Sequence, residues 1–111
     1  MIGAKPYLVV RASLDPAVFA EFETWYRREH LPHVLSIPGI VRAYRSDWNR
    51  GQVNWTALYE FASDDSVQEA LGSAEARVAR ADWERWLPHV SELSVEVYAC
   101  LGPIATYHHC N

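Results

Sequence analysis

Two helical stretches, set among four short strand-like segments, restrict most strongly how this chain can fold. The strand-like segments alternate apolar and polar residues or are rich in β-branched side chains, whereas the helical stretches repeat apolar residues every three or four positions. One helical stretch follows the first strand and the other follows the third. The order β-α-β-β-α-β predicts an α+β, ferredoxin-like fold, with a four-stranded antiparallel sheet and both helices on one face. Strands are expected over residues 7–11, 40–48, 53–61 and 92–101, and helical regions over residues 16–31 and 64–87.

Turn and capping residues set these boundaries. Asp15 and Pro16 have the residue types preferred at an N-cap and at the first position of a helix. We expect this helix to end near Glu29 or Leu31, with Pro32 opening a further short turn through Leu35 and Pro38-Gly39 ending it. In the second helical region Gly72 separates two pieces, each with a serine at its start, and Pro88 ends the region.

Length and composition indicate a single globular domain. The 111 residues form one expected domain, 1–111, with 102–111 as a C-terminal tail, and 50% of them are hydrophobic. A net charge of −4 without a basic run argues against nucleic-acid binding. No apolar run approaches the roughly 20 residues that span a bilayer, and no signal-peptide pattern follows Met1, so no membrane association and a cytoplasmic location are expected. Cys100 and Cys110 are expected to carry free thiols.

The second face of the predicted sheet needs a partner. In the third strand Trp55 and Tyr59 share one face, and the opposite face carries a mixture that includes Leu58 and Glu60. The first strand is apolar on both faces. A mixed face that no helix covers favours a second sheet packed on it, which a two-fold homodimer supplies.

A histidine continues the core-facing stripe of the first helix. Phe19, Phe22, Tyr26, His30 and His33 follow one another at steps of three or four residues. His30 could act as a general acid or base on a ligand between helix and sheet. Alternatively, it could tie down the turn after it by hydrogen bonding to the backbone. His33 is expected to be exposed.

Aromatic residues are the other candidates for a pocket. Glu29, a quarter turn from His30, is expected to bind Arg42 or Arg45 or to face solvent. A phenol in the pocket would supply a hydrogen-bond donor or weak acid, and strand register decides whether Tyr44 or Tyr59 faces the helices. The candidate ligand-binding residues could wall a cavity for a flat apolar molecule or could simply pack the core; they are Tyr26, Trp55, Trp83 and Trp86.

Metal and cofactor motifs are weak. His30-x-x-His33 and the tail sequence His108-His109-Cys110 contain ligand types but lack further ligands at the spacing of structural zinc. No Gly-rich phosphate loop and no Gly-x-Ser-x-Gly sequence occurs. We expect no metal and no cofactor, although one histidine would be enough to ligate a haem.

The first helix and the strand after it resemble a known family. The sequence Trp25-Tyr26-x-x-Glu29-His30-Leu31-Pro32, the Pro38-Gly39 turn and the arginine-bearing segment 41–45 are similar to the dimeric α/β-barrel superfamily, most of all to its EthD-like members. The resemblance implies two such sheets pairing into a dimeric barrel, with a small apolar pocket between helices and sheet. The superfamily includes cofactor-independent monooxygenases, polyketide cyclases, lactone isomerases and haem-using enzymes.

Two functions fit these observations. The first is a small cofactor-independent enzyme of oxygenase, cyclase or isomerase type acting on an apolar, aromatic or polyketide-like molecule. In it His30 transfers a proton, a tyrosine holds an oxygen and tryptophans exclude water. The second is a non-catalytic small-molecule-binding or accessory protein of a degradation or biosynthetic pathway. A pocket with a convergent polar group favours the first, and a filled core with a backbone-bonded His30 favours the second.

Overall fold

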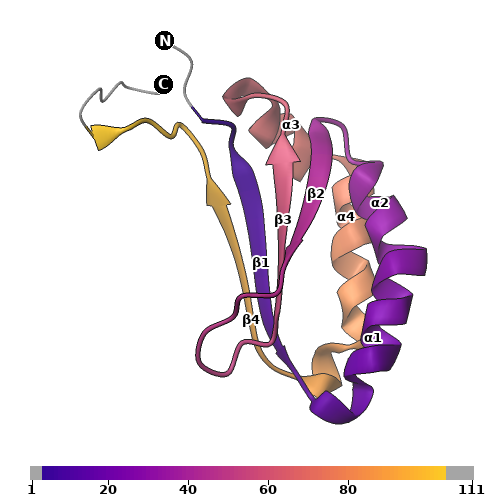
Figure 1. The fold of residues 1–111 in the computed structure, drawn as a ribbon. Coiled ribbons are helices and arrows are strands. Elements are labelled where there is room, and N and C mark those ends of the chain that lie inside the picture. The colour runs from indigo at the N-terminus through magenta and orange to yellow at the C-terminus, as the bar shows by residue number, and fades with distance from the viewer. Residues whose placement is uncertain (1–3, 105–111) are drawn as a thin grey trace.

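The computed structural model describes residues 4–104 and has the predicted order of strands and helices. Its four strands are β1 (Tyr7–Leu14), β2 (Ile40–Ser46), β3 (Trp55–Phe61) and β4 (Val90–Tyr98). They form one antiparallel sheet in the order β2-β3-β1-β4. The helices lie on one side of this sheet (Figure 1). The prediction of an α+β, ferredoxin-like chain is therefore confirmed.

The first helical region continues through Pro32 without the expected break, and it ends at Leu35, where the short turn after Pro32 was expected to end. A short 3-10 turn (Pro16–Val18) leads into α1 (Phe19–Trp25), a π-helical turn (Tyr26–His30) and α2 (Leu31–Leu35). In the π turn the Leu31 N–H bonds to the Tyr26 carbonyl, five residues back. The backbone hydrogen bond just before the proline thus spans one residue more than in an α-helix. Pro32 lies in the first turn of α2, the helix position where the missing N–H of a proline is best tolerated.

The second helical region has the two predicted pieces. Ser63 and Ser66 form a capping box around a 3-10 turn (Asp64–Ser66), which continues into α3 (Val67–Leu71). The Ser73 side chain accepts a hydrogen bond from the Ala76 N–H at the start of α4 (Ala74–Asp82). Two 3-10 turns, Trp83–Arg85 and Leu87–His89, connect α4 to β4.

The helix-facing side of the sheet forms the core. Trp55, Ala57, Tyr59 and Phe61 alternate along β3 and are all buried. The helices cover β2, β3 and β1 but leave β4 at the far edge (Figure 1). Apolar side chains of β4 on this side stay exposed, and Val95 is 59% exposed.

The other sheet face has no helix over it. A carboxylate lies buried there: Glu60 is 4% exposed and accepts a hydrogen bond from Arg42 at 2.8 Å. The hydroxyls of Tyr7 and Tyr44 also donate to Glu60, each at 3.4 Å. A hollow of about 660 Å³ on this face lies among apolar groups that include Leu58.

The strand bounds and one cysteine differ from the sequence-based expectations, with β2 ending at Ser46 instead of residue 48 and β3 beginning at Trp55 instead of residue 53. β1 extends to Leu14, and β4 begins and ends earlier than expected, at Val90 and Tyr98. Cys100 is disulfide-bonded, so the expectation of a free thiol there is wrong. Cys110 lies outside the described residues, as does most of the expected tail. No helix within residues 4–104 is long and apolar enough to cross a bilayer.

Gly39→Ala should destabilise the fold more than Gly51→Ala. Both glycines have positive φ, +96° and +61°, a conformation that costs other residues about 1–2 kcal/mol. A Cβ on Gly39 would lie 3.1 Å from the Ser66 Cβ, whereas a Cβ on Gly51 meets nothing within 4 Å. Because each kcal/mol lowers Tm by about 4–8 °C in a domain of this size, thermal melts resolve the difference. Equal Tm values would contradict this account of the turn.

Candidate functional site

A cavity of about 120 Å³ lies between the helices and the sheet. Apolar side chains of β1, β3, α2 and α4 make most of its wall, and they include Leu8, Val10, Val34, Phe61 and Ala79. Four of the lining residues have side chains with a polar atom: His30, Tyr59, Arg80 and Trp83. Three of these, His30, Tyr59 and Trp83, are predicted site residues, and the fold brings them together.

His30 is buried and held in a fixed orientation. Its side chain is 4% exposed, and its ring stacks on Trp25 at 5.2 Å with an interplanar angle of 16°. The edge of Trp83 lies on another side at 5.8 Å. The Nδ1 atom lies 3.0 Å from an Asp82 carboxylate oxygen, so the side-chain partner of His30 is a carboxylate rather than the backbone near Pro32. The π turn supplies this position at the end of the first helical stretch.

Asp82 is the residue of this candidate site that the sequence analysis did not single out. It is the last residue of α4, and the same carboxylate oxygen also lies 2.7 Å from His33 Nδ1. His33 is 46% exposed, in line with the expectation of exposure. Its hydrogen bond to Asp82 nevertheless links it to the buried His30, which contacts the same oxygen. One signal was available: Asp82 follows the buried Ala76 and Ala79 at two steps of three residues, which places a carboxylate on the inner helix face.

The pKa directions favour a neutral imidazole at His30. Burial lowers its pKa from the ordinary value of 6.5, and the hydrogen bond to Asp82 offsets part of this effect. Burial by itself would raise the pKa of Asp82, but the hydrogen bonds from His33 and His30 have the larger combined effect, so the pKa of Asp82 is lowered from its ordinary value. With Asp82 ionised, Nδ1 of a neutral His30 carries the proton and donates to it. Nε2 is then the basic nitrogen, as a general base requires.

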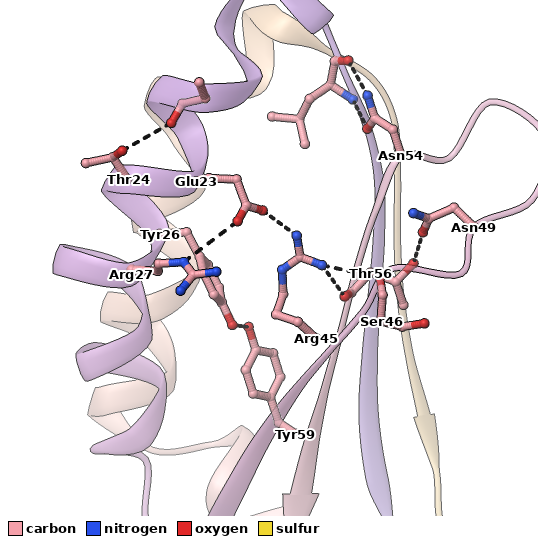
Figure 2. A network of polar contacts seen from close by, with 12 residues as sticks. Glu23, Thr24, Tyr26, Arg27, Arg45, Ser46, Asn49, Asn54, Thr56 and Tyr59 are labelled. Atoms are coloured by element: carbon pink, nitrogen blue, oxygen red, sulfur yellow. Dashed lines mark hydrogen bonds and ion pairs between the residues drawn. The ribbon is translucent and has the colours of Figure 1, made fainter.

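Tyr59 supplies a protonated phenol at the cavity wall. Its hydroxyl lies 2.8 Å from the hydroxyl of Tyr26 on the π turn (Figure 2). Burial raises the pKa of both phenols, that of Tyr59 well above 10.0. Both hydroxyls therefore keep their protons at neutral pH. When Tyr26 donates to Tyr59, the Tyr59 hydrogen is free to bind an oxygen in the cavity.

The remaining aromatic candidates pack behind the cavity rather than around it. Trp55 and Trp86 are 0% and 3% exposed, and each ring meets Phe22 at 5.3 Å in an edge-to-face arrangement. Tyr26 also lies in this aromatic cluster, with its ring 4.9 Å from Trp55. Of the four predicted ligand-binding residues, only Trp83 reaches the cavity wall.

Other predicted residues lie elsewhere. Tyr44 is on the opposite sheet face, where it donates to Glu60, so the strand register selects Tyr59 as the phenol that faces the helices. Glu29 is exposed and lies 3.9 Å from Arg85, not near Arg42 or Arg45. The tail sequence His108-His109-Cys110 lies outside the described residues.

Arg45 joins the edge strand to the first helix beside the site. It forms an ion pair with Glu23 of α1 and donates to the Thr56 carbonyl at 3.2 Å (Figure 2). Its guanidinium lies 5.1 Å from the centre of the Trp55 ring. These contacts anchor β2 against the helix that carries His30. Within residues 4–104, no group of three or more His, Cys, Asp or Glu side chains is arranged to hold a metal ion.

Comparison with solved structures identifies the fold. An EthD family protein from Bacillus halodurans superimposes with a TM-score of 0.71 at 15% identity, over 86% of this chain and 97% of that one. A DABB family protein with a ferredoxin-like fold, from Mesorhizobium loti, gives 0.62 at 18% identity, over 87% and 97%. The chain shares the fold of these two proteins, one of which is described as ferredoxin-like. This confirms, for the fold, the resemblance drawn from residues 25–45.

A cofactor-independent oxygenase has the same fold. SnoaB from Streptomyces nogalater gives a TM-score of 0.57 at 19% identity, over 92% of this chain and 98% of that one. No family model and no curated protein sequence matches the chain. The similarity thus describes the fold, and the chemistry must be argued from the site.

His30 should make the fold sensitive to acid near neutral pH. Because its folded pKa is below 6.5, the unfolded chain binds more protons there, and stability falls as pH decreases from 6.5 through the folded pKa. Asp82 does not contribute here, since the stability from its lowered pKa is lost only below about pH 4. Urea unfolding at pH 7.5, 6.5 and 5.5 should give a steeper decline for wild type than for His30→Gln.

The exposed His89, which does not contact Asp82 or His30, offers a matched control. His89→Gln should keep the wild-type decline, because the His30–Asp82 contact is intact. If wild type and His30→Gln declined in parallel between pH 7.5 and 5.5, burial of a neutral His30 would be contradicted.

Proposed function

We propose that the chain is a small cofactor-independent enzyme that transfers a proton to or from an apolar small molecule bound in the cavity beside His30. The observation that carries the proposal is the His30–Asp82 contact at the wall of an apolar cavity. A buried carboxylate-bonded imidazole with a lowered pKa is matched to general base catalysis near neutral pH. The similarity in fold between this chain and a cofactor-independent oxygenase supports this class of reaction.

Three residues take roles in the proposed reaction. His30 Nε2 removes a proton from a carbon next to a carbonyl group, and Asp82 stabilises the imidazolium that forms. The Tyr59 hydroxyl donates to the oxygen on which negative charge develops. Trp83 and the apolar wall keep water away from the anion. Tyr44 has no role in this scheme, because it lies on the other face of the sheet.

The alternative is a binding or accessory protein that uses the same cavity without chemistry. The observation that favours it is the packing of Trp55, Trp86 and Tyr26 as core, which leaves a small cavity with few polar groups. The two functions differ in whether His30 exchanges protons with a bound ligand.

Deuterium exchange on a small ketone separates these functions. Cyclohexanone has a single ring and exchangeable hydrogens next to its carbonyl, and NMR in buffered deuterium oxide near neutral pD follows their loss. Wild type should accelerate the exchange over buffer. His30→Gln should lower the protein-dependent rate by about 10²–10⁴-fold, the usual effect of losing a general base. Asp82→Asn should lower it less, because His30 stays in place without its orienting carboxylate.

The exposed His89 again supplies the matched control, and His89→Gln should exchange cyclohexanone at the wild-type rate. An exchange rate in the presence of wild type equal to that in buffer, with the ketone shown by NMR to be bound, would contradict catalysis and establish the binding function.

A homodimer through the open sheet face is part of the same proposal. That face has a hollow of about 660 Å³ whose wall includes Val9, Leu58 and Trp48, and Trp48 is 75% exposed. A second copy of the sheet would cover these apolar groups and the buried Glu60 together. The cytoplasm remains the proposed location.

Leu58→Arg should break this dimer, because it places an unpaired charge in the centre of the proposed interface. Val78→Arg is the control, since Val78 is 48% exposed on α4, on the other side of the sheet. Light scattering at micromolar concentration should give a dimer for wild type and Val78→Arg and a monomer for Leu58→Arg. A monomeric wild type would refute the dimer.

A further inference from the structure

Arg80 is a cation at the wall of the apolar cavity. It comes from α4, two residues before Asp82, and its guanidinium donates to the Leu71 carbonyl at 3.3 Å. In the part of the chain that the structure describes, Arg80 takes part in no ion pair. By contrast, an ion pair with a glutamate is formed by each of Arg11, Arg42 and Arg45.

The position of Arg80 fits the mouth of the cavity. Its side chain is exposed, and so is that of Val95 on β4, which lines the same cavity from the sheet edge that the helices leave uncovered. His30, which is 3% exposed, lines the closed part. A ligand that enters between α4 and β4 therefore passes the guanidinium before its far end reaches the imidazole.

The size and polarity of the cavity restrict that ligand. A volume of about 120 Å³ is close to the roughly 150 Å³ of an apolar protein cavity that holds benzene. The interior therefore accommodates one ring and leaves any charged substituent at the mouth. No carboxylate is among the residues that line the cavity, so a cationic ligand would have no partner there.

We infer that the cavity takes a single-ring apolar molecule carrying an anionic oxygen group, a carboxylate or an acidic enolate or phenolate, which Arg80 binds at the mouth. The inference rests on the proposed function, since the ring must lie in the cavity beside His30. Arg80 acts as a specificity-determining residue: its fork of N–H groups matches two carboxylate oxygens, and a charge-assisted pair favours the anion over a neutral isostere.

Benzoate and benzamide test the inference, because they have the same ring and nearly the same shape and differ in charge. NMR titration at neutral pH gives both dissociation constants and, through the ring signals of His30, the place of binding. Wild type should bind benzoate about tenfold more tightly than benzamide, and both probes should shift the His30 signals. Arg80→Gln should remove the preference for benzoate and leave benzamide binding unchanged, and Arg80→Lys should restore part of it.

Arg77→Gln is the matched control, since Arg77 is exposed on the same helix but does not line the cavity. It should keep the full preference. Equal binding of the two probes by wild type, or a preference that persists in Arg80→Gln, would overturn the assignment of Arg80 while leaving the proposed function intact. Binding of both probes without any shift at His30, or of neither, would overturn this inference, and binding away from His30 would also count against the proposed pocket.

Discussion

Hydrogen bonds to Asp82 join the two helical regions next to the buried His30. One carboxylate oxygen of Asp82 forms hydrogen bonds with Nδ1 of His30 on the π turn and Nδ1 of His33 on α2. Asp82 ends α4, about fifty positions later in the chain. Burial opposes charge on both partners, whereas their mutual hydrogen bond favours it. The balance leaves an ionised Asp82 and a neutral, oriented His30, and the proposed chemistry depends on that pair.

The aromatic core gives this pair its surroundings. Phe22 stands at the centre of a cluster of tryptophan and tyrosine rings that fills the space beside the cavity. Close packing of large rings fixes the ring plane of His30 and keeps the cavity small. The helices leave β4 uncovered (Figure 1), and two exposed residues, Val95 of β4 and Arg80 of α4, line the cavity. Packing thus determines both which end of a ligand meets His30 and which end meets a cation.

The sequence predicts the parts of this structure that depend on local periodicity. The stripe Phe22, Tyr26 and His30 is buried as expected, because residues three or four apart share a helix face. A break was expected before Pro32, but the helix continues from the π turn into α2, with Pro32 in the first turn of α2. Strand alternation alone could not decide whether Tyr44 of β2 or Tyr59 of β3 faces the helices, because the answer depends on how the two strands pair. In the structure Tyr59 pairs with Ala43 and Tyr44 pairs with Leu58, so the two phenols lie on opposite faces. Asp82 was missed because its contact with His30 is a long-range one.

The protonation pattern of the His30 ring tests the central claim most directly. Two-dimensional correlation of ring protons with ring nitrogens, assigned by the loss of signals in His30→Gln, reports which nitrogen carries hydrogen. At pH 7.5 we expect a neutral ring with hydrogen on Nδ1, facing Asp82, and a basic Nε2. A ring with hydrogen on Nε2 alone, or an imidazolium with hydrogen on both nitrogens, would contradict the account of His30 as an oriented general base.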